Sequence, residues 1–416
     1  MTTSASLRPD TALAELRRHW VALSALIVGV AFGVSSLCFY TFGAFIGPLI
    51  AAKHWNRAGI SAALLTALVM PLASPVLGRL VDAGRARLLV LTGHAVLVLG
   101  FLAMTQIGGD VRQLWLLYGA LFLLAGGSSP IGYTRLLVSR FRVARGLALG
   151  LCMAGTGIAA LFGPRVVTSA ILAHGWQAGY VVLAVAAASA IPIVALLVSA
   201  EPVARPAGLA VAATAARLSA SERRLLRFLL ALFLLAALAV TGLVVHLIPF
   251  LRDRGMSPLD AATVAGVIGL AVIATRVLIG AALDRYPMHL VTSGTFLLTG
   301  AGVLMPAVLG SSAAWIGALA IGLLLGAEID VIAFVMARLF AETAYGHCYS
   351  RGYSAFIVGS ALSPMLAGAV RDATGSYTPF FLGSAVTLFA CAAAALRIPR
   401  ERETPVLAPS LTAEAA

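Results

Sequence analysis

The chain alternates long apolar runs with short polar turns, and this pattern occurs twelve times. The hydrocarbon core of a membrane is about 30 Å thick, which takes about 20 residues of helix at about 1.5 Å per residue. Each run therefore predicts one membrane-spanning helix. The predicted spans are residues 20–49, 60–81, 88–107, 114–138, 147–172, 180–198, 226–251, 259–283, 290–309, 313–337, 345–370 and 378–396.

Several residues recur at nearly the same offset in the two halves of the chain. The recurring pairs are Asp82 and Asp284 (284 − 82 = 202 residues apart), Pro48 and Pro249 (201), Arg140 and Arg338 (198), and Pro164 and Pro364 (200). Repeats in one order and at nearly one spacing predict two halves of similar build. We therefore expect an all-α membrane protein with twelve transmembrane helices in two pseudo-symmetric six-helix bundles.

The polar segments divide the chain further. The expected units are an N-terminal cytoplasmic segment (1–19), an N-terminal six-helix bundle (20–200), a cytoplasmic linker (201–225), a C-terminal six-helix bundle (226–397) and a disordered cytoplasmic tail (398–416). The linker is rich in Ala, Pro and Arg, and the tail carries prolines among mixed charges, which is typical of segments without a packed core.

The composition agrees with this prediction. Hydrophobic residues make up 61% of the chain and charged residues 11%, whereas a soluble domain is nearer half apolar and a quarter charged. The net charge of +13 does not indicate nucleic-acid binding, because the basic residues lie in short turns and not in a basic groove with interleaved aromatics. The four cysteines lack the spacing of a disulfide framework or a metal site, and we expect no metal and no cofactor.

Arginine and lysine are distributed unevenly between the two sides of the predicted membrane. With the N-terminus inside, 19 of the 29 fall in inner turns and tails and 6 in outer turns. The outer residues are Lys53, Arg57, Arg112, Arg252, Arg254 and Arg371, and those at membrane depth are Arg135, Arg165, Arg276 and Arg351. Because cytoplasmic loops carry the excess of positive charge, both termini are predicted to be cytoplasmic.

The turn after the second apolar run carries a charged pattern. Gly78 is followed four residues later by Asp82, and then by Gly84, Arg85 and Arg87. This pattern resembles the signature of the major facilitator superfamily between its second and third helices. The resemblance implies that Gly78, Asp82 and Arg85 hold the cytoplasmic gate, with Asp82 at the start of the eleventh helix.

A partial second copy follows the eighth run. Gly280, Asp284 and Arg285 match the first copy, but Tyr286 and Pro287 stand where the basic end would come. The same resemblance implies that Gly280 and Asp284 take part in gating at the start of the fifth helix.

Three stretches narrow the resemblance to one branch. Residues 39–49, 140–150 and 326–338 resemble the first-helix end, the fifth-helix entry and the tenth helix of the monocarboxylate transporters and oxalate–formate antiporters. Proteins like these move small organic anions, often with a proton or in exchange for another anion. The chain has Val272 where animal members carry an aspartate, and it lacks the lysine of the oxalate carrier in helix eleven. The substrate and the coupling ion therefore stay open.

Ionisable groups at membrane depth are candidates for function because burying them is costly. Arg276 stands eight residues before Asp284, and Asp330 stands eight residues before Arg338, so both lie at a similar depth. The planar guanidinium of Arg276 suits a substrate carboxylate. Asp330 or Glu328 could balance that charge and carry a proton, and only one of them should face the cavity. The alternative is an ion pair that only fixes helix packing.

Four further residues are weaker candidates for ligand contact. Tyr40 and Tyr133 offer hydroxyl groups, and His246, beside Pro249, offers a group that titrates near neutral pH. Packing within the bundle is the alternative role of each. Arg165 is either a second anion contact or a side chain that extends to the membrane surface.

These features favour a secondary active transporter that moves a small organic anion, a monocarboxylate, by alternating access with a proton. A drug or metabolite efflux antiporter and an anion exchanger are the alternatives on the same fold. An enzyme is not expected, since the chain has neither a phosphate-binding Gly-Lys loop nor a His-Glu-x-x-His motif. The expected partners are the organic anion, a proton or counter-anion, and the lipid bilayer. Arginine and alanine usage with a single lysine indicates a GC-rich bacterial gene and hence a bacterial inner membrane. We also expect a monomer.

Overall fold

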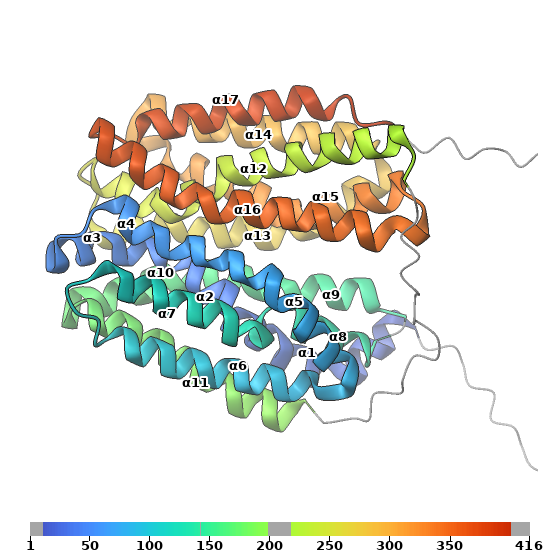
Figure 1. The fold of residues 1–416 in the computed structure, drawn as a ribbon, viewed down its shortest axis with the longest axis horizontal. Helices are drawn as coiled ribbons and strands as arrows, with labels where there is room; N and C mark the ends of the chain where they lie inside the picture. The colour runs from blue at the N-terminus through green and yellow to red at the C-terminus, as the bar shows by residue number, and fades with distance from the viewer. Residues whose placement is uncertain (1–10, 142, 199–217, 401–416) are drawn as a thin grey trace, which may run out of the picture.

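The computed structural model describes residues 11–141, 143–198 and 218–400. Within these ranges every regular element is a helix. The helices run side by side in two layers, with the first half of the chain in one layer and the second half in the other (Figure 1). The predicted all-α architecture is confirmed.

The first half builds its spans from short helices separated by breaks. The first and second spans comprise α1 (Ala12–Ala31), α2 (Val34–Tyr40), α3 (Phe42–Lys53), α4 (Arg57–Ser61), η1 (Ala62–Leu68) and α5 (Val69–Leu80). The third and fourth comprise η2 (Val81–Arg85), α6 (Ala86–Met104), α7 (Val111–Leu124), η3 (Gly126–Ser128) and α8 (Pro130–Val138). The fifth and sixth comprise α9 (Arg145–Met153), α10 (Gly155–His174) and α11 (Trp176–Leu197).

The second half builds each span from one long helix. These helices are α12 (Ala220–Arg252), α13 (Pro258–Arg285), α14 (Met288–Leu309), α15 (Ala314–Leu339), α16 (Glu342–Thr374) and α17 (Thr378–Ala395), with the short turn η4 (Gly310–Ala313) between α14 and α15. They agree closely with the predicted runs. In an unbroken helix every backbone N–H and C=O group inside the membrane is hydrogen-bonded within the same helix.

Twelve spans follow from the lengths of these helices. Eight stretches are long and apolar enough to cross a membrane, and α1 with α2, bent by 42°, makes a ninth. One of the eight is the 52-residue stretch Met288–Leu339, which would be about 78 Å long at about 1.5 Å per residue and therefore holds two spans. The joined pairs α4–α5 and α7–α8 supply the last two.

The break in the first span has a tertiary cause. A Cβ atom on Gly33 would lie 2.2 Å from the backbone oxygen of Ser128, so only glycine permits this approach. The amide of Val34 donates a hydrogen bond to Ser128 Oγ at 3.2 Å, which replaces the helical bond lost at the bend. The predicted single helices over 20–49 and 114–138 are therefore wrong: each is broken where the first and fourth spans meet.

The first helix of each half begins before the predicted apolar run. α1 begins at Ala12 with Thr11 as its N-cap. α12 begins at Ala220, where Ser219 and Glu222 form a capping box with bonds of 2.9 and 3.2 Å, so the last residues of the expected linker are helical. The rest of the expected linker and the expected tail lie almost wholly outside the described residues, and the division into these units stays a prediction.

Both ends of the described chain lie at one end of the bundle, together with the ends of α11 and α12 that flank residues 199–217 (Figure 1). We call this the inner end and the opposite one the outer end. This placement agrees with an even number of crossings in each half. The assignment of the inner end to the cytoplasm rests on the arginine count and stays a prediction.

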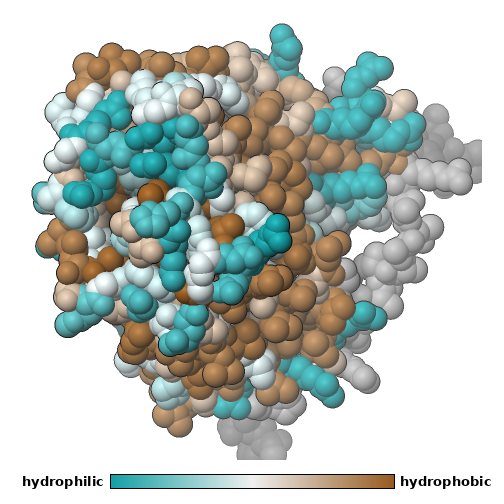
Figure 2. Space-filling view, turned by 60° about the vertical axis from the view of Figure 1, so that its left-hand side comes forward, coloured by the Kyte–Doolittle hydropathy of each residue, from teal (hydrophilic) through white to brown (hydrophobic). Residues whose placement is uncertain are grey.

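The surface is divided as a membrane requires. Polar side chains gather over the ends of the bundle, and an apolar belt surrounds its middle (Figure 2). Leu72, Leu196 and Val386 are 78%, 81% and 67% exposed, which is unfavourable in water but not against lipid. The protein is a multi-pass membrane protein.

Candidate transport site

Arg276 and Asp330 form an ion pair inside the C-terminal half. Arg276 lies nine residues before the inner end of α13 (285 − 276 = 9), and Asp330 lies nine residues before the inner end of α15 (339 − 330 = 9). At about 1.5 Å per residue both lie about 13 Å from that end. Arg276 Nη1 is 3.5 Å from Asp330 Oδ2. The predicted equal depth is confirmed, and the two side chains meet.

The pair leaves hydrogen-bonding capacity on the guanidinium. The contact uses one nitrogen at the upper limit of a hydrogen bond, and Arg276 Nε is buried without a partner among the described residues. The side chain of Arg276 is 9% exposed, whereas that of Asp330 is 42% exposed. A guanidinium has five N–H donors, so Arg276 can donate hydrogen bonds to a further carboxylate while the more accessible Asp330 moves aside.

Tyr40 brings the N-terminal half to this pair. It is the last residue of α2 and is half-buried. Its hydroxyl lies near the side chain of Thr156 and within electrostatic reach of Arg276 and Glu328. The candidates Arg276, Asp330 and Tyr40 therefore share one region between the two halves.

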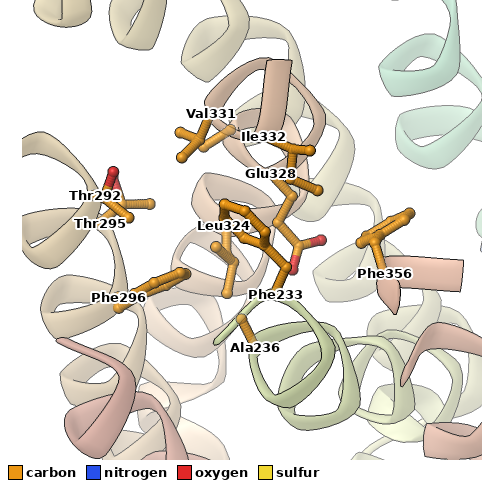
Figure 3. Close-up of a pocket in the computed structure, with 11 residues that line it drawn as sticks. Phe233, Ala236, Thr292, Thr295, Phe296, Leu324, Glu328, Val331, Ile332 and Phe356 are labelled. Atoms are coloured by element: carbon orange, nitrogen blue, oxygen red, sulfur yellow. The ribbon is translucent and has the colours of Figure 1, made fainter. Parts of the chain in front are cut away.

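Glu328 points away from the ion pair into the C-terminal bundle. Its carboxyl is 5% exposed, and both oxygens are buried without a partner among the described residues. The small pocket around it lies between α12, α14, α15 and α16 (Figure 3). Its lining is mainly apolar and consists of Phe233, Ala236, Thr292, Thr295, Phe296, Leu324, Ala327, Val331, Ile332 and Phe356. The prediction that the two acids face different ways is confirmed: Asp330 contacts Arg276 and is accessible, and Glu328 is enclosed.

Two other candidates lie elsewhere in the fold. Tyr133 is fully buried in the N-terminal half, where its hydroxyl lies 3.3 Å from His94 Nε2 and its ring packs on Gly29. His246 lies six residues from the outer end of α12 (252 − 246 = 6), or about 9 Å. Arg276 lies 18 residues from the outer end of α13 (276 − 258 = 18), or about 27 Å. The structure therefore does not bring Tyr133 or His246 to Arg276.

The turn predicted to hold the gate is irregular. Gly84 has φ of 79° inside η2, a conformation that favours glycine. A Cβ on Gly78 or on Gly280 would meet nothing within 4 Å, so neither glycine serves a close approach in this conformation. Asp284 is exposed in the last turn of α13. The side chain of Asp82 lies outside the described atoms, and the gating role of these residues and of Arg85 stays a prediction.

Asp82→Asn is expected to slow transport and to increase the inward-open population several-fold. A carboxylate at a helix N-terminus contributes about 0.5–2 kcal/mol. A free-energy difference of this size changes the ratio of two conformational states several-fold. The yield of a disulfide between engineered cysteines on the two halves at the inner end measures the population. An unchanged yield in a normally expressed variant would contradict the gating role.

Residues that sequence reasoning did not select also line this region. The rings of Tyr345, Tyr349, Tyr353 and Phe356 stack in sequence along α16, with centroids 5.7, 6.2 and 5.9 Å apart. We call this set the α16 aromatic stripe. All four rings are half-buried, Tyr349 lies within electrostatic reach of Asp330, and Phe356 lines the Glu328 pocket. The four-residue spacing of the three tyrosines was the signal in the sequence, because such residues share a helix face.

The described residues contain no group of three His, Cys, Asp or Glu side chains arranged to hold a metal ion. Cys38, Cys152, Cys348 and Cys391 are buried free thiols.

Two bundles of six spans, with a charge pair inside the C-terminal bundle at membrane depth, have the architecture of a secondary transporter. The sequence model of the Major Facilitator Superfamily matches residues 28–336, which is 309 of the 416 residues (336 − 28 + 1 = 309). The chain belongs to this superfamily, whose members are transporters and not enzymes.

Two relatives are named as monocarboxylate transporters. Monocarboxylate transporter 11 of Homo sapiens is 28% identical over 374 residues, which cover 84% of this chain and 77% of that protein. Monocarboxylate transporter 13 of Rattus norvegicus is 27% identical over 391 residues, which cover 90% and 88%. The predicted resemblance to the monocarboxylate-transporter branch is confirmed.

Solved structures share the fold at low sequence identity. A nucleoside transporter superposes with a TM-score of 0.70 at 13% identity, covering 91% of this chain and 99% of that one. A D-xylose–proton symporter gives 0.70 at 11% identity, with coverage of 92% and 98%. A bacterial homologue of the human lysosomal transporter Spinster, in an inward-facing and unoccupied conformation, gives 0.68 at 14% identity, with coverage of 91% and 96%.

Proposed function

We propose that the protein carries a small organic monocarboxylate together with one proton, at a site centred on Arg276. The observation that carries this proposal is the guanidinium of Arg276, which lies about 13 Å from the inner end of α13. Its Nε has no partner among the described residues, and it makes one long contact to the accessible Asp330. Relatives named as monocarboxylate transporters support the same substrate class.

The charge count favours one carboxylate. Arg276 and Asp330 are neutral as a pair, and a bound carboxylate adds one negative charge in a region where an unpaired ion is heavily penalised. Protonation of Asp330 removes that charge and frees the guanidinium for a bidentate contact with the substrate. Binding of the anion and of the proton therefore support each other.

The α16 aromatic stripe favours an apolar or aromatic remainder on the substrate. The depths of Tyr349 and Tyr353 along α16, about 10 and 16 Å from its inner end (349 − 342 = 7 and 353 − 342 = 11 residues), bracket that of Arg276. Half-buried rings next to Asp330 offer surface on which a flat or apolar group can pack. A dicarboxylate such as oxalate would bring a second charge, whereas Arg276 is the one cation of the ion pair and Arg351 of α16 is exposed, so we expect it to be a poor substrate.

Glu328 has a different role in this proposal. A carboxylate without partners among apolar side chains is strongly disfavoured, so the neutral acid suits its pocket best. We assign the transported proton to Asp330, which contacts Arg276, and we regard Glu328 as a neutral group of the bundle interior. The alternative assignment to Glu328 is a distinct outcome of the amide substitutions described in the Discussion.

Uptake into proteoliposomes tests the substrate class. Lactate, benzoate, phenylacetate and oxalate, each radiolabelled, are offered with an inward proton gradient and without one. We expect the aromatic and aliphatic monocarboxylates to accumulate above their external concentration only with the gradient, and oxalate to remain near background. Accumulation that depends on a preloaded counter-anion and not on the gradient would identify an exchanger, and preferred uptake of oxalate would contradict the one-charge argument.

A further inference from the structure

Arg57 joins the two halves at the outer end. It begins α4, and its side chain reaches into the C-terminal half: Nη2 lies 3.4 Å from Asp253 Oδ1, and Nε donates to the Tyr377 hydroxyl at 3.1 Å. The carboxylate of Asp372, also in the C-terminal half, accepts from the backbone amides of Arg57 and Ala58 at 3.4 and 2.9 Å. One residue of the N-terminal half therefore contacts three residues of the other half.

Asp253 is held by two arginines. Arg371 Nε donates to Asp253 Oδ2 at 2.6 Å, while Arg57 contacts the other oxygen of the same carboxylate. Asp372 instead accepts from backbone amides of the N-terminal half. The side chains of Arg57, Asp253 and Arg371 are only 21–28% exposed, so solvent screens these contacts less than it screens fully exposed pairs.

A second layer of contacts lies beneath the charged one. His246 is fully buried on α12, with Nδ1 3.0 Å from the Tyr377 hydroxyl and Nε2 2.9 Å from the Pro364 carbonyl oxygen and 3.1 Å from Ser61 Oγ. Ser61 belongs to the N-terminal half, so this layer also crosses between the halves.

The hydrogen bonds of the two layers run in one direction. Burial raises the pKa of Tyr377, although the neighbouring Arg57 lowers it, and its hydroxyl keeps the proton. That hydroxyl accepts from Arg57 Nε and donates to His246 Nδ1, so the neutral imidazole carries its proton on Nε2 and donates to the Pro364 carbonyl oxygen. The same Nε2 proton is shared with Ser61 Oγ, which acts as a second acceptor.

The backbones approach closely at the same place. A Cβ on Gly368 of α16 would lie 2.8 Å from the backbone nitrogen of Ala58, and one on Gly43 of α3 would lie 2.3 Å from the Val245 oxygen of α12. Glycine at these positions lets the halves meet at the outer end without a gap. Polar contacts and packing therefore close the same end of the bundle.

We propose that Arg57, Ser61, His246, Asp253, Asp372 and Tyr377 form an outer latch, a set of positioning residues that holds the two halves together on the outer side. In alternating access the two bundles must separate at this end for the outward-open state, so these contacts must break once in every cycle. The latch sets the balance between the two states and contacts no substrate. This inference depends on the transporter class and is independent of which anion is carried.

Distance measurements by pulsed electron paramagnetic resonance test the outer latch without substrate. Spin labels are placed at Ala52→Cys and Ser312→Cys, which are exposed at the outer ends of opposite halves, in protein reconstituted in nanodiscs. The four native thiols are buried, and unmutated protein exposed to the label controls for their reaction. We expect Arg57→Ala and Asp372→Ala each to increase the longer-distance population about five- to tenfold, as the loss of one hydrogen bond of ordinary strength predicts.

Arg254→Ala is the matched control. Arg254 is an arginine of the same outer end, but its contacts with Thr378 and the ring of Phe250 stay within the C-terminal half. It should leave the distances unchanged. Thermal unfolding of each variant separates a shift between states from a loss of fold. The latch is refuted if folded Arg57→Ala, Asp372→Ala and the double variant all keep the distance distribution of the parent protein.

Discussion

Arg276→Ala is expected to raise the Kd for the transported carboxylate about 30- to 4,000-fold and to abolish measurable uptake. Removing one partner of an enclosed, hydrogen-bonded charge pair costs about 2–5 kcal/mol, and about 1.4 kcal/mol is tenfold in affinity. Arg276→Lys keeps the charge but loses the planar fork, so we expect about a tenfold loss with some transport remaining. Equilibrium binding of a labelled monocarboxylate to the purified protein measures both effects.

Two controls make this result specific. Arg276→Ala leaves Asp330 without its cation, so the double variant Arg276→Ala/Asp330→Asn, which removes both charges, shows whether lost binding comes only from a stranded aspartate. Arg165→Ala removes an arginine of the outer side whose Nη1 donates to Thr263 at 2.6 Å across the two halves. It should keep the affinity of the parent protein. If Arg276→Ala binds the carboxylate with the affinity of the parent protein and Arg165→Ala binds it more weakly, the carboxylate site lies at Arg165.

Asp330→Asn is expected to abolish proton-driven accumulation while it leaves substrate binding within about threefold of the parent. The variant holds a permanently neutral side chain beside Arg276, as the protonated acid would be, so the anion still binds but no proton is taken up with it. In the parent protein affinity should rise as pH falls, because protonation of Asp330 and anion binding support each other. In Asp330→Asn this pH dependence should disappear. Uptake with and without a proton gradient, and binding across pH, measure the two effects.

Glu328→Gln is the matched comparison, since it makes the same acid-to-amide change two residues away on the same helix. Glu328 has no described partner and lies in an apolar pocket, so its replacement by a neutral amide should preserve accumulation. If Glu328→Gln loses proton-driven accumulation while Asp330→Asn keeps it, the transported proton belongs to Glu328. The proposed contact between the substrate carboxylate and Arg276 would still hold in that case.

The spans could be predicted from the sequence because the membrane imposes one length on every apolar run. Breaks within spans could not, because they depend on distant contacts: the bend at Gly33 exists where Ser128 of the fourth span accepts the amide of Val34, 94 residues away. No local pattern around Gly33 announces that contact.

Part of the site could also be predicted from residue spacing. Equal counts of residues to the inner ends of α13 and α15 place Arg276 and Asp330 at one depth, and helical periodicity turns Glu328 away from Asp330. The spacing could not say which acid faces Arg276, because that depends on the rotation of α15 in the bundle. The outer latch was beyond reach for another reason: Arg57 and Asp372 are 315 residues apart and lie at the ends of helices α4 and α16 with no distinguishing motif.

A structure of the protein with a bound monocarboxylate tests the central claim most directly. We expect the two carboxylate oxygens to lie within about 3 Å of Arg276 Nη2 and Nε, with the Asp330 carboxyl displaced from its present position 3.5 Å from Nη1 and the remainder of the substrate against the α16 aromatic stripe. Carboxylate density away from Arg276, whether at Arg165 or elsewhere between the halves, with the Arg276–Asp330 pair intact, would contradict the account.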